Sequence, residues 1–254
     1  MTKPLIVAHR GDRKNAPENT LPAFASAIQK GADGIELDVH WSKDEHLVVH
    51  HFFGYDTPAG ESHLIMETTL AELKRLDVGS PFSPAFSDVR IPTLAEVLDL
   101  GKGKVRFEID LKGSSLPFLQ AVIAEVERFG VEDDVELTTA HYGLLSHVKK
   151  LHPRLRTGTF FLQPPEWMPL RLAQRHVIDW ATLFEIQVPH LHASLLTDDF
   201  VDQLRRRGLL VYVFNLSSKE DIGWGLSKGL DFFSTDELEM ALQMRSEFTN
   251  RSRV

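Results

Sequence analysis

The 254-residue sequence contains no cysteine, no long apolar run and no dense block of basic residues. Without cysteine there are no disulfides, thiolate nucleophiles or iron–sulfur clusters, so any metal must be held by Asp, Glu, His or backbone oxygens. No apolar stretch approaches the roughly 18 residues that cross a bilayer. With a net charge of −8, the chain is not expected to bind nucleic acid or to insert stably into a membrane.

The N-terminal segment is also short of apolar residues. Its one apolar run, residues 5–8, is too short to form the core of a signal peptide. We therefore expect a cytoplasmic protein. No Gly-, Ser- or Pro-rich linker divides the chain, so residues 1–254 are interpreted as a single domain. Exposed helices often mediate dimers, so a homo-oligomer is compatible with the sequence.

Short runs typical of buried strands recur eight times, with amphipathic segments between them. The runs are residues 5–8, 34–40, 105–111, 135–139, 156–161, 182–187, 209–214 and 231–234. The helical segments include residues 21–30, 115–129, 142–151, 168–177, 197–207 and 237–245, and a capping box opens another at Thr93. Eight strand–helix alternations in about 250 residues predict an α/β fold, a closed (β/α)8 barrel.

Residues 47–51 interrupt the alternation, because they look like a strand yet follow the second run after only a few polar residues. A hairpin fits this gap, with residues 43–46 as its turn, whereas a parallel crossover does not. The symmetric register places Trp41 opposite Val48, and Asp38 opposite His51 on the same face. Residues 52–91 then hold one helical pattern, at 69–76, and are expected to form a small insertion on the face where barrel active sites lie.

Acidic and apolar residues alternate strictly along the second run. Glu36 and Asp38 share one face, which points into a barrel rather than to solvent. Two inward carboxylates within about 7 Å repel each other and lose hydration unless a cation joins them. This pattern therefore predicts a divalent metal site. Taken alone, it would favour a half-solvated strand in another fold.

The next barrel strand repeats the alternation and ends on a lysine. Asp110 and Lys112 share its inward face, so Asp110 supplies a third carboxylate for an all-oxygen site suited to Ca²⁺ or Mg²⁺. The lysine indicates an anionic ligand such as a phosphate. Glu108 lies one step deeper, where we expect a buried partner for Lys112 or a nearby arginine.

The first strand ends in His9 and Arg10, at the edge where catalytic groups of a barrel gather. Histidine exchanges protons near neutral pH, and arginine can clamp a phosphate with two hydrogen bonds. His9 and His51 therefore form a candidate acid and base pair. Glu18 is placed to orient His9 or Arg10, and Asn19 to cap the first helix.

Taken together, these motifs resemble the glycerophosphodiester phosphodiesterase family. The matching segments run in order: His-Arg-Gly at 9–11, Pro-Glu-Asn-Thr at 17–20, Gly-Ala-Asp-Gly-Ile-Glu-Leu-Asp-Val at 31–39, Leu-Val-Val-His-His at 47–51, Ile-Pro-Thr-Leu-Ala-Glu-Val-Leu at 91–98 and Ser-Thr-Asp at 234–236. The resemblance implies a TIM barrel that uses a divalent cation to hydrolyse glycerophosphodiesters, such as glycerophosphocholine or glycerophosphoethanolamine, to sn-glycerol 3-phosphate and an alcohol.

The resemblance also implies the roles of seven residues. His9 and His51 are the acid and base, Arg10 and Lys112 contact the substrate phosphate, and the metal ligands are Glu36, Asp38 and Asp110. We expect in-line displacement at phosphorus, in which one histidine takes a proton from the nucleophile and the other protonates the leaving alkoxide. The nucleophile is either water or the substrate's own glycerol hydroxyl.

Two departures from the family pattern stand near these residues. Asp110 replaces the usual Glu, and Phe52 follows the second histidine where the family has Asp.

Alternative functions are a lysophospholipase D activity on single-chain lipids and a catalytically silent phosphate-binding barrel. The aromatic residues that could line a lipid channel, Phe52, Phe53, Tyr55, Phe82 and Phe86, are expected instead to form the insertion's own core. His141 follows a strand and is placed where it can touch substrate.

Overall fold

The computed structural model describes residues 3–56 and 62–251, in which eight parallel strands close into a barrel. In order around the barrel they are β1 (Leu5–Ala8), β2 (Gly34–Trp41), β6 (Arg106–Leu111), β7 (Val135–Thr138), β8 (Arg156–Phe161), β9 (Val188–Leu191), β10 (Tyr212–Val213) and β11 (Phe232–Thr235). The barrel closes because β11 pairs with β1, and β1 with β2. The (β/α)8 barrel expected from the alternation is confirmed.

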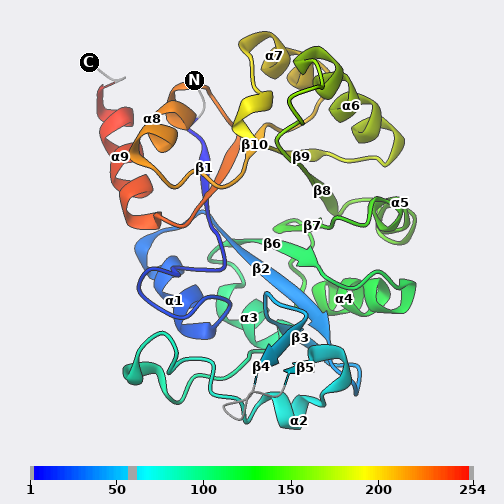
Figure 1. Cartoon of the computed structure of the whole chain (residues 1–254), viewed down its shortest axis with the longest axis vertical. Coiled ribbons are helices and arrows are strands. Elements are labelled where there is room, and N and C mark those ends of the chain that lie inside the picture. The colour runs from blue at the N-terminus through cyan, green and yellow to red at the C-terminus, as the bar shows by residue number, and fades with distance from the viewer. Residues whose placement is uncertain (1–2, 57–61, 252–254) are drawn as a thin grey trace.

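Helices follow the strands along the chain and lie outside the barrel (Figure 1). They are α1 (Leu21–Lys30), α3 (Leu94–Gly101), α4 (Leu116–Phe129), α5 (Tyr142–Leu151), α6 (Leu170–Leu183), α7 (Asp198–Arg206), α8 (Lys219–Ser227) and α9 (Leu238–Arg251). Their apolar sides pack on outward strand residues such as Leu37 and Ile109, which leaves Glu36 and Asp38 to face inward. Within the described residues, no helix is long and apolar enough to cross a membrane.

One expected strand is wrong. Residues 182–187 do not form a strand, because α6 continues to Leu183 and the sixth barrel strand is β9. The buried stripe of α6 extends through Ile178 and Ala181, so the apparent alternation belongs to the helix end and the turn after it. Pro189 lies within β9 and hides the strand from a pattern search, because proline is rare inside sheets.

The hairpin after β2 is present, but its expected register is wrong by one residue. The partner strand β3 (Leu47–Val49) places Leu47 opposite Trp41 and Val49 opposite Val39. The turn explains the shift: the Glu45 N–H donates to the Ser42 carbonyl at 3.0 Å, and Glu45 adopts a left-handed φ of 62°. This is a three-residue loop with a left-handed third position, not the symmetric four-residue turn.

The insertion after the hairpin contains β4 (Gly54–Asp56), β5 (Ser62–Leu64), the one-turn helix α2 (Leu70–Leu73) and 3₁₀ turns at Ile65–Glu67 and Pro84–Phe86. Part of the expected insertion, residues 57–61, lies outside the described residues. Its small core joins Ile65 and Leu73 to Val48 and Ile91. Figure 1 places it beside β3, at one end of the molecule.

The expectation that aromatic residues form this core is largely wrong. Tyr55 packs against it, but Phe52 and Phe53 are 62% and 61% exposed and Phe82 is 44% exposed. Phe86 lies outside that core and contacts the ring of Phe82. Aliphatic side chains supply the core, which leaves two phenylalanines next to His51 facing solvent.

The interior of the barrel is polar below the strand ends. His190 on β9 is fully buried, with Nε2 2.6 Å from Glu136 Oε1 and Nδ1 3.3 Å from Glu108 Oε1. Tyr212 donates its hydroxyl to Glu108 at 2.5 Å. We expected Lys112 or an arginine to be the partner of Glu108, and this expectation is wrong. A Cβ at Gly158 would overlap Glu136 and lie 2.9 Å from His190 Nε2, so a larger residue here would force these two side chains to shift.

Burial sets the ionisation of this cluster. It raises the pKa of Glu136 to about 8 and lowers that of His190 to about 4, so both groups are neutral near pH 7. Between the usual glutamate value and pH 8, the folded chain then binds more protons at Glu136 than the unfolded chain. Stability therefore falls as pH rises through this window.

A substitution tests this buried acid. Raising the pH from 7 to 9 ionises Glu136 and should therefore lower the unfolding free energy, by on the order of 1 kcal/mol. Glu136→Gln should show an alkaline loss smaller by roughly that amount, measured by urea denaturation at both pH values. Glu239→Gln, at a side chain 78% exposed, is the control and should match the parent. An unchanged alkaline loss in Glu136→Gln would mean that Glu136 is already ionised at pH 7.

Candidate active site

Three buried carboxylates meet at the carboxyl ends of β2 and β6. The two strands pair in register, so that Asp38 lies beside Asp110 and Glu36 beside Glu108. One oxygen each from Glu36, Asp38 and Asp110 lies within 4.8 Å of the others, in an arrangement that could hold a metal ion. The structure thus brings together the three residues expected from the alternating pattern.

The electrostatics of this cluster favour a bound cation. Burial, reinforced by the neighbouring carboxylates, raises the pKa of Glu36 well above its usual value, and burial also raises the pKa of Asp110. Burial would likewise raise the pKa of Asp38, but hydrogen bonds from His51 and Asn19 and the charge of Lys112 hold it well below its usual value. Three carboxylates are therefore buried close together. Their mutual repulsion and lost hydration cost free energy, which a bound divalent cation would offset.

Lys112 lies between two of the carboxylates. Its Nζ is 2.7 Å from Asp38 Oδ1 and 2.6 Å from Asp110 Oδ2. Burial works against its charge, but these two carboxylates outweigh burial and raise the pKa of Lys112. The lysine remains an ammonium at the strand ends, where it can meet an anionic ligand.

His9 is held by an aspartate from the far end of the chain. Its Nδ1 lies 2.8 Å from Asp236 Oδ1, and Asn215 donates to the other oxygen of Asp236 at 2.8 Å. Burial acts in the opposite direction, yet the contacts with His9 and Asn215 lower the pKa of Asp236 to about 2. The Nε2 of His9 is 4.0 Å from Glu36, so the fixed ring presents this nitrogen to the carboxylates.

His51 approaches the same cluster from the hairpin. Its Nδ1 is 3.3 Å from Asp38 Oδ2, although the two residues are not opposite each other in the observed register. The contact arises because β3 ends at Val49 and the chain then bends. The ring of Phe52 lies edge-on to His51, with centroids 4.7 Å apart.

Arg10 is tied to the carboxylates through both backbone and side chain. Its N–H donates to Glu36 at 3.0 Å, and its Nε lies 3.4 Å from Asp38 Oδ2. Glu18 pairs with Arg10 at 3.0 Å and with Arg13 at 2.6 Å, which confirms the expected contact with Arg10. Arg10 adopts a φ of 60°, and this rare conformation turns its N–H toward Glu36.

Asn19 does not cap the first helix, contrary to expectation. The residue at the N-cap is Thr20, while Asn19 has a φ of 56°. The amide of Asn19 donates to Asp38 Oδ2 at 2.7 Å and its carbonyl accepts from the Asp38 N–H at 3.2 Å. This two-point contact fixes Asp38 and stands in place of a cap.

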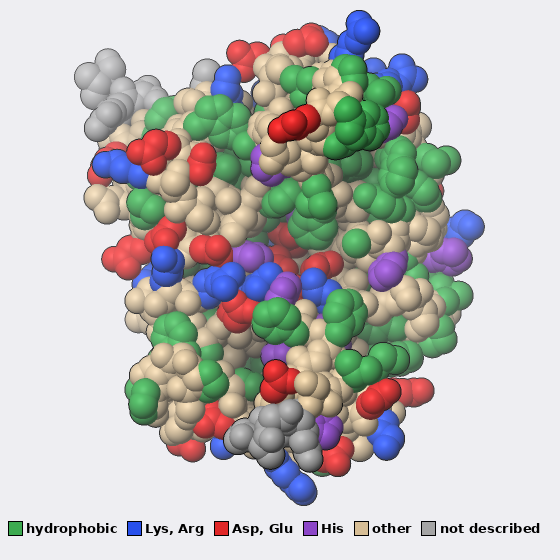
Figure 2. Space-filling view, in the orientation of Figure 1, with side chains coloured by type: hydrophobic (Ala, Val, Ile, Leu, Met, Phe, Trp, Pro, Cys, Tyr) green, Lys and Arg blue, Asp and Glu red, His purple; other side chains and the backbone are tan. Residues whose placement is uncertain are grey.

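Sequence reasoning missed several of these groups. Asp236 was noted only as the end of a motif, although an acid directly after the last barrel strand was a usable signal. Arg13 carried no such signal, and Asn215 was assigned no role. Figure 2 shows the result on the surface: charged side chains and histidines gather in a band across the middle of this face, with hydrophobic patches on either side.

The remaining histidines differ in outcome. His190 lies on β9 inside the barrel, a position that the strand expected at 182–187 did not indicate. His141 stands at the N-terminus of α5 and lines a cavity together with Asp110 and Lys112. Its contact with substrate stays a prediction.

Comparison with known proteins agrees with this arrangement. The chain is 32% identical to a glycerophosphodiester phosphodiesterase of Caldanaerobacter subterraneus subsp. tengcongensis, over 95% of this chain and 98% of that protein. It is also 32% identical to one of Bacillus altitudinis, over 97% and 99% of the two chains.

Solved structures share the fold. A phosphodiesterase of Oleispira antarctica, determined in complex with the product sn-glycerol-3-phosphate, has a TM-score of 0.82 at 25% identity and covers 96% of this chain and 97% of its own. A glycerophosphoryl diester phosphodiesterase structure from Silicibacter pomeroyi has a TM-score of 0.81 at 24% identity, over 96% and 93% of the two chains. A model of the glycerophosphoryl diester phosphodiesterase family matches residues 9–240. The chain therefore belongs to the glycerophosphoryl diester phosphodiesterase family, a family of phosphodiester hydrolases.

Proposed function

We propose that the chain hydrolyses glycerophosphodiesters, such as glycerophosphocholine or glycerophosphoethanolamine, to sn-glycerol 3-phosphate and an alcohol. One observation carries the proposal. His9 and His51 each contact a different member of the carboxylate trio, which consists of Glu36, Asp38 and Asp110. His9 lies 4.0 Å from Glu36, and His51 lies 3.3 Å from Asp38. Two proton-transfer groups thus flank one candidate cation site. The product complex of the Oleispira antarctica phosphodiesterase supports the same product class for this chain.

Glu36, Asp38 and Asp110 would hold one divalent cation, Ca²⁺ or Mg²⁺. The donor set fits, since it is all oxygen, it is buried, and its carboxylates repel one another in the absence of a cation. When bound, the cation supplies positive charge that polarises the phosphate. The three carboxylates, a divalent cation, Arg10 and Lys112 together give the site a net charge near +1. This net charge suits a singly charged phosphodiester.

The remaining roles belong to side chains of the chain itself. Arg10 and Lys112 contact the phosphate and neutralise charge that develops during displacement. One histidine takes the proton of the attacking oxygen, and the other donates a proton to the leaving alkoxide. Asp236 acts through His9, because its hydrogen bond to Nδ1 fixes the ring and leaves Nε2 for proton transfer. Either water or the substrate's glycerol hydroxyl is compatible with this arrangement.

The silent phosphate-binding barrel is the weaker alternative, because a module that only binds phosphate has no need of two histidines beside a carboxylate trio. The single domain, cytoplasmic location and homo-oligomer expected from the sequence stay predictions. A lysophospholipase D activity gains some support from the exposed phenylalanines at 52 and 53. Comparing the hydrolysis of lysophospholipids with that of short-chain diesters distinguishes it.

The proposed activity is tested by incubating the chain with glycerophosphocholine and measuring sn-glycerol 3-phosphate with a coupled dehydrogenase assay. Steady release of glycerol 3-phosphate is expected with added Ca²⁺ or Mg²⁺. A chain that binds glycerol 3-phosphate but releases none from glycerophosphocholine or glycerophosphoethanolamine would instead support the silent barrel.

A further inference from the structure

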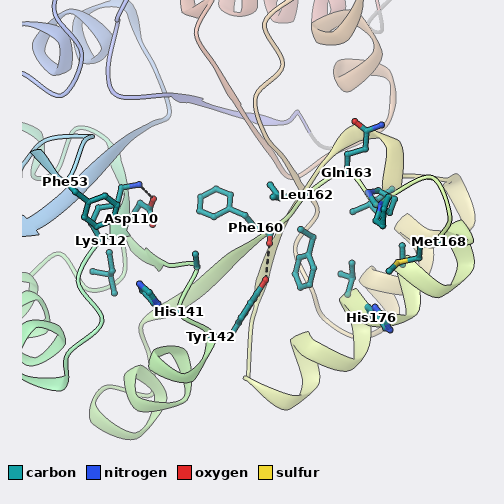
Figure 3. A pocket seen from close by; sticks show the side chains of 18 residues that line it. Phe53, Asp110, Lys112, His141, Tyr142, Phe160, Leu162, Gln163, Met168 and His176 are labelled. Carbon is teal, nitrogen blue, oxygen red and sulfur yellow. Dashed lines mark hydrogen bonds and ion pairs between the residues drawn. The ribbon is translucent and has the colours of Figure 1, made fainter.

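A cavity of about 660 Å³ opens directly beside Asp110 and Lys112 (Figure 3). Its walls come mainly from the ends of β6 to β8, the segment that follows β8, and α6, with Phe53 added from the segment after β3. Much of this wall is apolar and includes Phe53, Phe160, Leu162, Met168 and Val177. The volume and the lining are typical of a site for a small organic ligand.

The opposite side of the carboxylate trio is polar. There Asp236 joins His9, Asn215 and Arg13, with contacts of 2.8, 2.8 and 3.4 Å. A phosphodiester bound over the trio therefore has one organic group near polar side chains and the other near the cavity. Glycerol carries two free hydroxyls, which lose hydrogen bonds with water unless polar groups replace them. The polar side suits the glycerol, and the cavity is left for the alcohol.

The charges of the cavity indicate what kind of alcohol it accepts. Among the described lining residues, Asp110 is the one carboxylate, and it is already paired with Lys112. The other polar side chains of the lining are His141, Gln163 and His176, with the hydroxyl of Tyr142 directed to the Phe160 carbonyl at 3.5 Å. A primary ammonium group, such as that of ethanolamine, would find no free carboxylate here, whereas an apolar group would bury surface against the walls.

We propose that this cavity binds the alcohol group of the diester and that the preferred alcohol is apolar, such as an alkyl chain of about six carbons. The proposal rests on the proposed function and extends it to substrate preference. Phe160, Leu162 and Met168 are then specificity-determining residues that contact the alcohol, while the phosphate and glycerol stay with the strand-end residues.

Synthetic glycerophosphodiesters with methyl, butyl and hexyl alcohols provide the test. Lengthening the chain barely changes the leaving-group pKa, so a difference in kcat/KM reports binding of the chain. We expect kcat/KM for the hexyl diester to exceed that for the methyl diester by about tenfold or more. The kcat/KM for glycerophosphoethanolamine should be close to that for the methyl diester.

Two substitutions locate the preference. Ala140→Trp places a large side chain at an exposed position of the cavity lining, and Leu162→Gln makes a 70% exposed wall residue polar. Each should lower the hexyl-to-methyl ratio severalfold. Ala124→Trp on α4 and Leu183→Gln on α6, at exposed positions outside the lining, are matched controls and should keep the parent ratio.

The outcomes separate this proposal from the proposed function. Equal kcat/KM for methyl and hexyl diesters would support the activity and overturn the apolar subsite. A hexyl preference that neither cavity variant alters would also overturn the apolar subsite. If an acyl chain on the glycerol of a lysophospholipid gains the same advantage, and the cavity variants remove it, the cavity holds the glycerol side instead. Hydrolysis of none of the diesters would overturn the proposed function, and the subsite with it.

Discussion

Replacing His9 or His51 with alanine is expected to lower kcat by about 10²- to 10⁴-fold, the usual contribution of a general acid or base. The expectation follows from position, since each ring contacts a carboxylate of the trio and is partly exposed, with 21% and 27% of the side chain accessible. Both rings can therefore reach a bound substrate. The measurement is the steady-state release of glycerol 3-phosphate at saturating substrate.

The control comes from the same hairpin as His51. His46 has a side chain 53% exposed, and its ring approaches Asp44 in the turn at 3.9 Å, so His46→Ala should retain parental kcat. Melting temperatures of all three variants show whether lost activity reflects lost folding. Near-parental kcat in a folded His9→Ala or His51→Ala variant would remove that residue from the proposed acid and base pair.

Removing the divalent cation with EDTA is expected to lower turnover by on the order of 10²-fold or more, because a Lewis acid at phosphorus contributes several kcal/mol to the transition state. Adding back Ca²⁺ or Mg²⁺ should restore it. A second readout does not depend on activity: the cation should raise the unfolding free energy by about 2.7 kcal/mol at a hundred times its Kd.

Two matched variants test whether the cation binds at the carboxylate trio. Asp110→Asn should lose most of the cation-dependent stabilisation, because it removes one of the three proposed ligands. Asp198→Asn makes the same chemical change at a side chain 85% exposed and should respond to the cation like the parent. Full turnover in EDTA, or equal stabilisation of both variants, would contradict the metal assignment to these residues.

Asp110 has a shorter side chain than the Glu expected at its position. The resemblance noted from the sequence implies Glu at this position, and the side chain of Asp110 shares Lys112 with Asp38 at 2.6 and 2.7 Å. The structure shows that the shorter acid still reaches the other two carboxylates. The departure therefore leaves the cluster intact.

Local pattern was sufficient to place most of the candidate site. Alternation along residues 34–40 and 105–111 tells which side chains point inward, because successive residues of a strand face opposite sides. Parallel barrel strands end at one edge, so Glu36, Asp38, Asp110 and Lys112 were expected together and are found together. The same pattern failed at 182–187, since a short alternating segment does not distinguish a strand from the end of a helix.

The contact between His51 and Asp38 shows the limit of pairing arguments. The expected register was wrong by one residue because turn geometry, here a left-handed Glu45, decides the register of a hairpin. The contact exists nevertheless, since the chain bends after Val49. A sequence pattern can thus identify the two partners without giving the path that joins them.

The sequence by itself determined the barrel, the inward carboxylates and the residues at the strand ends, because these depend on periodicity within single elements. Only the tertiary structure decided which distant residues meet. His9 and Asp236 are 227 residues apart and become neighbours because β11 closes on β1. Asn19 fixes Asp38, and His190 fills the barrel interior beside Glu136. Such contacts depend on strand register and on closure of the barrel, which no local pattern contains.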